Sequence, residues 1–130
     1  MRFEAPASAD RCGVVGLGGV VLRGANGGNG VIVWLRQRDS LTSGDWPVVQ
    51  RTDSVIARGA IVGARFVIGE VAHGVPLDSG VVTVTPAATV VSARARGSGL
   101  EIAAAGRVTV DAAFDAVPLG TDTVPCWMQP

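Results

Sequence analysis

The chain has 130 residues, 11 basic and 11 acidic groups, and no net formal charge. Its length fits one domain, and its charge balance argues against a dedicated nucleic-acid-binding module, which would carry an excess of basic side chains. Hydrophobic residues make up 48% of the sequence and charged residues only 17%, which is low for a soluble domain. Because no apolar run approaches the 20 or so residues of a membrane span, and no apolar segment follows a basic start, we expect a soluble cytoplasmic product without a signal peptide.

The first third of the chain predicts a β-hairpin. Residues 14–23 are apolar, residues 31–38 are rich in β-branched side chains, and the glycine-rich residues 24–30 are expected to form a mobile loop between them. Alternate side chains of the second segment share a face: Val31, Val33 and Leu35 on one side, and Ile32, Trp34, Arg36 and Arg38 on the other.

The middle of the chain predicts short strands between polar loops. Residues 39–45 (DSLTSGD) are expected to form a loop, and residues 46–51 a short strand whose Pro47 favours an edge position. The apolar residues 53–72 are interpreted as two strands, 54–57 and 60–71. A helix is the alternative there, but three glycines and many β-branched residues disfavour it.

The second half of the chain predicts a meander of strands. Residues 73–80 are expected to form a loop, residues 81–85 and 89–96 to form strands, and residues 97–99 (GSG) to form a turn. Strict alternation makes residues 107–114 the clearest strand, with Val108, Val110, Ala112 and Phe114 on one face. The residues after Phe114, which include three prolines, are expected to be irregular.

Eight or nine strands at intervals of about 8–12 residues predict an all-β fold. We expect a single-domain antiparallel β-sandwich or a small β-barrel, and the pattern does not choose between them. The expected parts are an N-terminal arm (residues 1–12), a β domain (residues 13–117) and a C-terminal tail (residues 118–130).

Side chains that perform catalysis or bind metals are sparse. His73, the one histidine, lies near Asp78 and Ser79 in the sequence, but no nucleophile motif accompanies it. The loop at 39–45 lacks the spacing of an EF-hand, and residues 16–19 (GLGG) lack the third glycine of a dinucleotide-binding loop. We therefore predict that the protein is not an enzyme and has no catalytic residue, no metal and no cofactor.

The two cysteines, Cys12 and Cys126, lie near opposite ends of the chain. A disulfide between them would join the two termini. Without a predicted signal peptide, two reduced thiols are the preferred interpretation. Their separation matches no zinc-binding spacing.

Low charge in a small, strand-rich domain favours self-association, because apolar surface and open strand edges both invite partners. Trp46 and Trp127, near a proline and the C-terminus, are candidate anchors in an interface. Arg94 and Arg96 share a strand face and are candidates for ion pairs between subunits. Trp34, inside an apolar strand, is expected in the core.

The valine- and threonine-rich strands at 81–89 (VVTVTPAAT) and 107–114 (RVTVDAAF), together with the terminal arms, resemble small accessory virion proteins of tailed bacteriophages. These are capsid decoration (cement) proteins and head–tail or tail-associated proteins. The resemblance implies a structural role as a homo-oligomer or within a capsid or tail, without nucleic acid or membrane as a partner. A small β-sandwich module that binds carbohydrate or peptide is the alternative.

Overall fold

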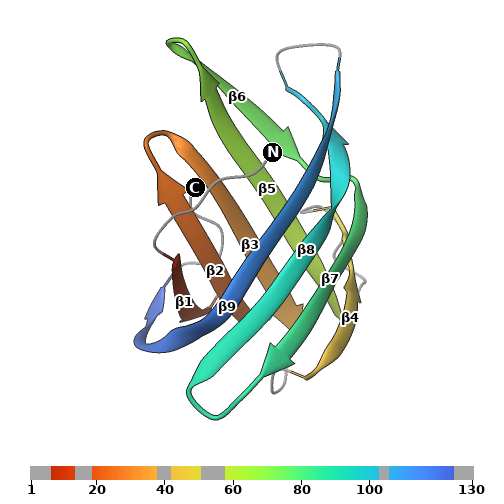
Figure 1. Cartoon of the computed structure of the whole chain (residues 1–130). Coiled ribbons are helices and arrows are strands. Elements are labelled where there is room, and N and C mark those ends of the chain that lie inside the picture. Colours follow the sequence, from red (N-terminus) through yellow and green to blue (C-terminus); the bar gives the residue numbers. More distant parts are fainter. Residues whose placement is uncertain (1–6, 14–18, 38–41, 51–57, 103–105, 125–130) are drawn as a thin grey trace.

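The computed structural model in Figure 1 describes residues 7–13, 19–37, 42–50, 58–102 and 106–124. These residues form nine β-strands and no helix. In chain order the strands are β1 (Ala7–Cys12), β2 (Gly19–Asn26), β3 (Asn29–Gln37), β4 (Gly44–Pro47), β5 (Arg58–Ile68), β6 (Val71–Pro76), β7 (Ser79–Pro86), β8 (Val90–Leu100) and β9 (Arg107–Val124). A membrane-crossing helix is accordingly not found in the described part of the chain.

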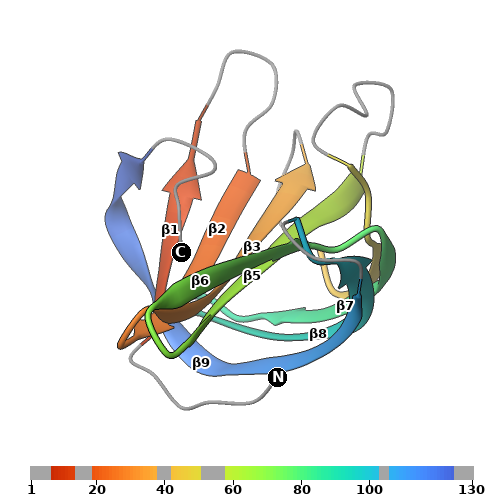
Figure 2. The same cartoon turned by 90° about the horizontal axis from the view of Figure 1, so that it is seen from above.

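All nine strands belong to one sheet, in the order β4-β7-β8-β9-β1-β2-β3-β5-β6. The sheet is rolled, as Figure 2 shows, but its two edge strands, β4 and β6, do not pair with each other. Both edges lie against β5 instead. β6 pairs with the second half of β5, and Val48, just after β4, forms a single parallel bridge with Ala60 at the beginning of β5. The predicted all-β fold is therefore confirmed, and the rolled sheet is compatible with a β-sandwich and not closed into a barrel.

One strand pair departs from the expected antiparallel arrangement. β1 runs parallel to β9, with Ala9 opposite Leu119 and Cys12 opposite Val124. β9 reaches β1 because it is 18 residues long and changes partners along its length, from β8 to β1. The register between β8 and β9 shifts at Ala116, which has a positive φ of 46° and donates its N–H to the hydroxyl oxygen of Ser92. Such a bulge bends a strand.

The core lies between the two halves of the rolled sheet. Its buried side chains come from both halves and include Leu22, Val33, Trp46, Val82 and Phe114. The alternation predicted for β3 is confirmed, since Val31, Val33 and Leu35 all face this core. The opposite face of β3 is also buried, because Ile32 and Trp34 belong to a second apolar cluster with Val21, Ile61, Val49 and Cys12.

Several predicted loops are shorter than expected. β2 and β3 extend to Asn26 and Asn29, so that only Gly27 and Gly28, both with positive φ, form the turn of the predicted hairpin. The predicted loop at 73–80 is wrong, because most of it belongs to β6 and β7. The predicted strand at 54–57 and the residues 39–41 of the first polar loop lie outside the described residues.

The predicted turn at residues 97–99 is also wrong, since β8 continues through it to Leu100. A Cβ atom added to Gly97 or to Gly99 would collide with the backbone oxygen of Ser79 or of Pro76, respectively. These glycines mark places where two backbones approach closely, which is the second common reason for glycine in a strand.

The sheet includes more of each chain end than predicted. Residues 7–12 of the expected N-terminal arm form β1, and residues 118–124 of the expected irregular tail continue β9. The outermost residues, 1–6 and 125–130, lie outside the described residues.

Cys12 is disulfide-bonded, which corrects the preferred interpretation of two reduced thiols. The chain's one other cysteine is Cys126, which lies outside the described residues. It follows Val124 by two residues in the sequence, and Val124 pairs with Cys12.

Candidate interaction surface

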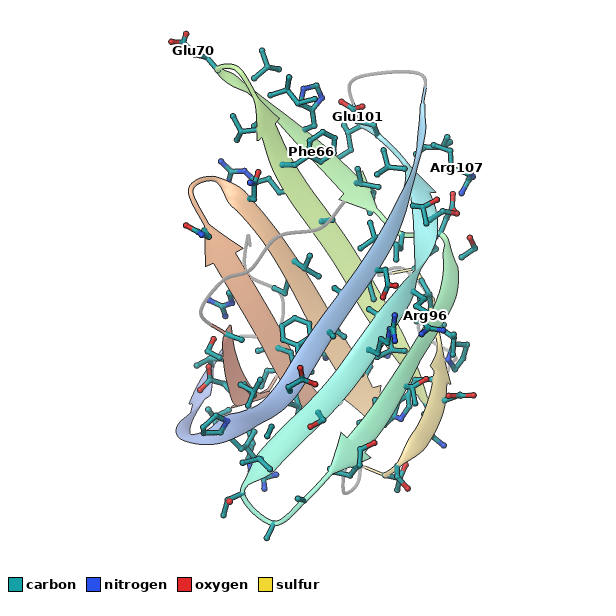
Figure 3. The ribbon with its side chains drawn as sticks, viewed as in Figure 1. Phe66, Glu70, Arg96, Glu101 and Arg107 are labelled. Carbon is teal, nitrogen blue, oxygen red and sulfur yellow. The ribbon has the colours of Figure 1, made fainter. Side chains whose placement is uncertain are left out.

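Exposed large hydrophobic side chains gather at the ends of two hairpins. Among the described residues they are Ile68 (64% exposed), Val71 (58%), Leu100 (55%) and Ile102 (78%). The first two flank the turn between β5 and β6, and the other two lie where the chain leaves β8. We call these four residues the hairpin-end surface. Figure 3 shows the two hairpin ends at the same end of the molecule, marked by Glu70 and by Glu101.

The β5–β6 hairpin projects beyond its neighbour in the sheet. Ile68 and Val71 pair across a two-residue turn, in which Gly69 adopts a positive φ of 64°, as the tight hairpin turns require. β3 pairs with β5 only as far as Arg65, opposite Gly30. Residues 66–73 therefore form a two-stranded ribbon that extends past the end of β3, and we call it the β5–β6 ribbon.

The apolar inner face of the sheet continues out along this ribbon. Ala64 and its partner Val75 are buried in the core. Two residues further out, Phe66 is half-buried opposite His73. Two residues beyond these, Ile68 and Val71 share the same face and are exposed. The end of the ribbon is therefore an extension of the core that the described residues leave open to solvent.

His73 connects the ribbon to the second hairpin. Its ring stacks on Phe66, with centroids 5.0 Å apart and planes 8° from parallel. Its Nδ1 atom contacts Oε1 of Glu101, just beyond β8, and both side chains are partly buried. The backbone N–H of Ile102 also donates to the carbonyl oxygen of Gly74 in β6, at 2.9 Å. These contacts hold the ribbon against the β8–β9 hairpin.

These surroundings do not support a catalytic role for His73. Its sequence neighbours are engaged elsewhere: Asp78 accepts two hydrogen bonds from Arg107, and the Ser79 hydroxyl contacts Ser98. The His73 ring contacts Phe66 and Glu101, and neither residue provides the hydroxyl or thiol that a histidine base activates. The arrangement is that of a structural histidine–carboxylate contact.

One backbone group on each edge of the ribbon has a hydrogen-bond partner where the ribbon leaves the sheet. On the β5 side, the side-chain oxygen of Asn29 accepts the N–H of Val67 at 3.0 Å. On the β6 side, the Gly74 carbonyl is taken by Ile102. These two contacts fix the base of the ribbon to β3 and to the segment that follows β8.

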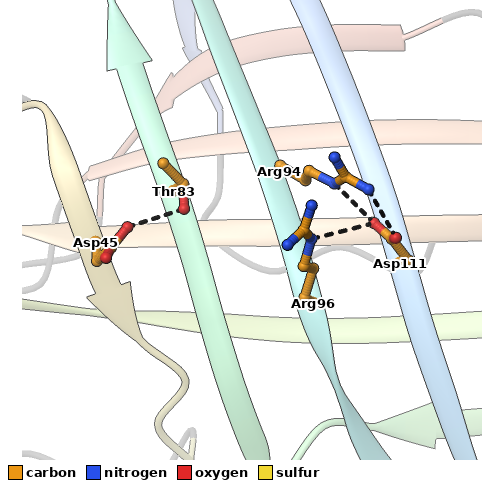
Figure 4. A network of polar contacts seen from close by, with 5 residues as sticks. All are labelled: Asp45, Thr83, Arg94, Arg96 and Asp111. Atoms are coloured by element: carbon orange, nitrogen blue, oxygen red, sulfur yellow. Dashed lines mark hydrogen bonds and ion pairs between the residues drawn. The ribbon is translucent and has the colours of Figure 1, made fainter.

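The outer face of β4, β7, β8 and β9 is polar and largely paired within the chain. Figure 4 shows Arg94, whose guanidinium makes two hydrogen bonds to Asp111, at 3.1 and 2.9 Å, with Arg96 3.9 Å from the same carboxylate. The hydrogen bonds that Arg94 donates to the Asp111 carboxylate raise the pKa of Arg94. In β4, Asp45 accepts a hydrogen bond from Thr83 at 2.9 Å. The two arginines predicted for an interface are thus exposed, but they already share an acidic partner.

The predicted role of Trp46 as an interface anchor is wrong. Trp46 is completely buried, its Nε1 atom donates to the carbonyl of Thr42 at 3.2 Å, and the Arg58 guanidinium lies 4.6 Å from its ring centroid. It therefore fills the core and offers no surface to a partner. Trp127, the second predicted anchor, lies outside the described residues.

Metal binding finds no support in the described part of the chain, where no three histidine, cysteine or acidic side chains come together. No protein-family model, curated protein or solved structure matches the chain.

Sequence reasoning missed the hairpin-end surface. A signal for it was present in the sequence at Leu100 and Ile102, two large apolar side chains beside Glu101 at a point where polar residues are usual.

Proposed function

We propose that this protein is a non-enzymatic structural subunit of a multi-subunit protein assembly and acts through contacts between protein surfaces. The observation that carries the proposal is the concentration of exposed apolar side chains on two adjoining hairpin ends. Isolated exposed hydrophobic residues are ordinary, but a concentration of them at one end is typical of a protein contact.

The four residues of the hairpin-end surface would also contribute favourable free energy when a partner covers them. Burying one large aliphatic side chain contributes about 1.5–3 kcal/mol, so burial of the hairpin-end surface supplies several kcal/mol to an association. Each subunit that repeats the contact in a symmetric assembly adds its share.

Within this class, a virion accessory protein of a tailed bacteriophage, in a capsid or a tail, is the more specific proposal. It rests on the resemblance of the strands at 81–89 and 107–114 to such proteins. The disulfide of Cys12 supports a working place outside the reducing cytosol, since virions are among the particles in which disulfides persist.

The alternative is a small β-sandwich module that binds carbohydrate or peptide, and its carbohydrate-binding form receives little support from the described residues. Such a module uses exposed aromatic rings as platforms, whereas Trp34, Trp46 and Phe114 are buried and Phe66 is half-buried under His73.

The test is absolute mass by size-exclusion chromatography with light scattering, over a wide range of protein concentration. We expect the wild type to form a defined oligomer. A variant with serine at all four positions of the hairpin-end surface should form an assembly of lower mass. A control variant with Arg94→Gln and Arg96→Gln should keep the wild-type mass. A wild-type protein of about 13 kDa at every concentration that also fails to bind empty capsids or tails of its source would refute the proposal.

A further inference from the structure

The hairpin of β2 and β3 contains the same chemically labile sequence twice. The chain reads NGGNG over residues 26–30, so that Asn26 precedes Gly27 and Asn29 precedes Gly30. Asparagine is a thermolabile residue, and a following glycine favours its reaction because no Cβ atom hinders the backbone nitrogen that attacks the side-chain amide. The two sites have the same local chemistry, and the fold gives them different surroundings.

The first site lies where the hairpin leaves the sheet. Asn26 is the last residue of β2 and pairs with Asn29 across the two-residue turn. Both Asn26 and Gly27 are exposed. Gly27 has a φ of 60°, and a Cβ atom added there would meet no atom within 4 Å. Because the last pair of a hairpin opens more easily than the pairs inside a sheet, the backbone here has the freedom to bring the Gly27 nitrogen to the Asn26 amide carbon.

The second site is held by the sheet. Gly30 is buried, and it pairs with Ala25 in β2 and with Arg65 in β5. The side-chain oxygen of Asn29 accepts the N–H of Val67 at 3.0 Å. A reaction at this site has to break that hydrogen bond and rotate a backbone that lies between two strands. The fold therefore protects Asn29.

We propose that Asn26 is a site of spontaneous deamidation, whereas Asn29 is protected in the folded chain. The Gly27 nitrogen loses its proton to hydroxide and forms a bond to the side-chain carbonyl carbon of Asn26. The bond from that carbon to the amide nitrogen breaks, and ammonia leaves with a proton from water. Water then opens the resulting five-membered imide. The net reaction exchanges the amide –NH2 for –OH from water and requires no oxidant, metal or cofactor.

The modification changes both the charge and the backbone of the turn, and its inference is independent of the proposed function. The product carboxylate adds a negative charge to a chain without net formal charge. Opening of the imide at the former backbone carbonyl gives isoaspartate, which adds a carbon atom to the main chain. Gly28 in this turn lies close to β5, because a Cβ atom added to it would be 2.8 Å from Cγ2 of Val67. A longer backbone therefore disturbs the contact between the turn and the base of the β5–β6 ribbon.

The test is incubation of the folded full-length chain at mildly alkaline pH, which favours loss of the backbone proton. Ion-exchange chromatography follows the added negative charge. Trypsin then releases residues 24–36 as one peptide, since they lie between Arg23 and Arg36 in the sequence, and fragmentation in a mass spectrometer distinguishes Asn26 from Asn29. We expect Asn26 to react at least about tenfold faster than Asn29, because reaction at Asn29 requires local opening of the sheet.

The chain unfolded in urea is the matched control, because both asparagines then precede an unhindered glycine and should react at similar rates. Asn26→Gln should remove most of the reaction in the folded chain, since glutamine has to form a larger ring. Equal rates at the two sites of the folded chain, or an Asn26 that stays intact under conditions in which the unfolded chain reacts, would overturn the proposal. The isoaspartate fraction should unfold at a lower temperature than the unmodified chain, and an unchanged unfolding temperature would contradict the disturbance of the turn.

Discussion

Replacing Trp46 with alanine separates the core role of this residue from the interface role that its sequence position predicts. Trp46 has 0% of its surface exposed. Burial of a tryptophan removes about 150–250 Å² from water, which at about 25 cal/mol per Å² corresponds to about 4–6 kcal/mol. Tryptophan-to-alanine substitutions in protein cores cost about 3–5 kcal/mol. We therefore expect Trp46→Ala to lower the free energy of unfolding by about 4 kcal/mol, a large part of the stability of an ordinary domain.

The measurement is urea unfolding followed by far-ultraviolet circular dichroism, because the substitution removes a fluorophore. Two protein concentrations separate loss of folding from loss of association, since association makes the apparent stability depend on concentration. Trp46→Phe is the matched control: it keeps an aromatic ring in the core but loses the N–H that donates to Thr42. We expect it to cost about 1–2 kcal/mol.

The reasoning is refuted by one clear result. If Trp46→Ala unfolds at the same urea concentration as wild type and has lost self-association, then Trp46 is an anchor for a partner and its burial among core side chains is incorrect.

Three further predictions concern other parts of the chain. Hydrogen bonding by Arg107 lowers the pKa of Asp78. The stability that the Asp78 carboxylate contributes is therefore present at neutral pH and lost as pH falls through that lowered pKa. Arg107→Gln should reduce the free energy of unfolding slightly at pH 7, and urea unfolding at progressively lower pH should show a smaller difference from wild type, because only the hydrogen bond from Arg107 to Ser98 then remains. Thermal unfolding should show a greater loss of stability for Gly28→Ala than for Gly27→Ala. Both positions have positive φ, but a Cβ added at Gly28 lies 2.8 Å from a side-chain carbon of β5, whereas the space at Gly27 is open. Equal losses of stability would contradict this packing. Reduction of the Cys12 disulfide, or Cys12→Ser, should lower the free energy of unfolding by about 2–4 kcal/mol. If unfolded protein that was never exposed to a reductant contains two titratable thiols, then no such bond forms.

The strands were predictable from sequence wherever apolar and polar residues alternate and one face of the strand is buried. β9 began as predicted, with Val110 and Phe114 buried and Val108 packed against the core. The extension of β9 beyond Phe114 was not predictable in this way, because its second half pairs with β1 from the opposite end of the chain. Prolines and a bulge indicate a loop locally, and only the distant partner makes them part of a strand.

Glycine was the residue type most often misinterpreted. Gly27 and Gly28 form a turn, and Gly97 and Gly99 lie within a strand, yet local sequence treats all four alike. The difference is set by what approaches the backbone from elsewhere in the fold. Burial of Trp46 had the same cause. Its flanking residues are polar or proline, and the core that encloses it is assembled from distant strands on both sides of it in the chain.

The hairpin-end surface lay beyond sequence reasoning because it repeats the pattern of the core. Ala64 with Val75 and Ile68 with Val71 are equivalent apolar pairs on the same face of one hairpin. The first pair is buried and the second is exposed only because β3 stops pairing at Arg65 while β5 and β6 continue. Strand length therefore decides where the core of one chain ends. Four residues beyond the buried pair, the hairpin still carries the apolar side chains of a core, and the described part of the chain leaves them open to solvent.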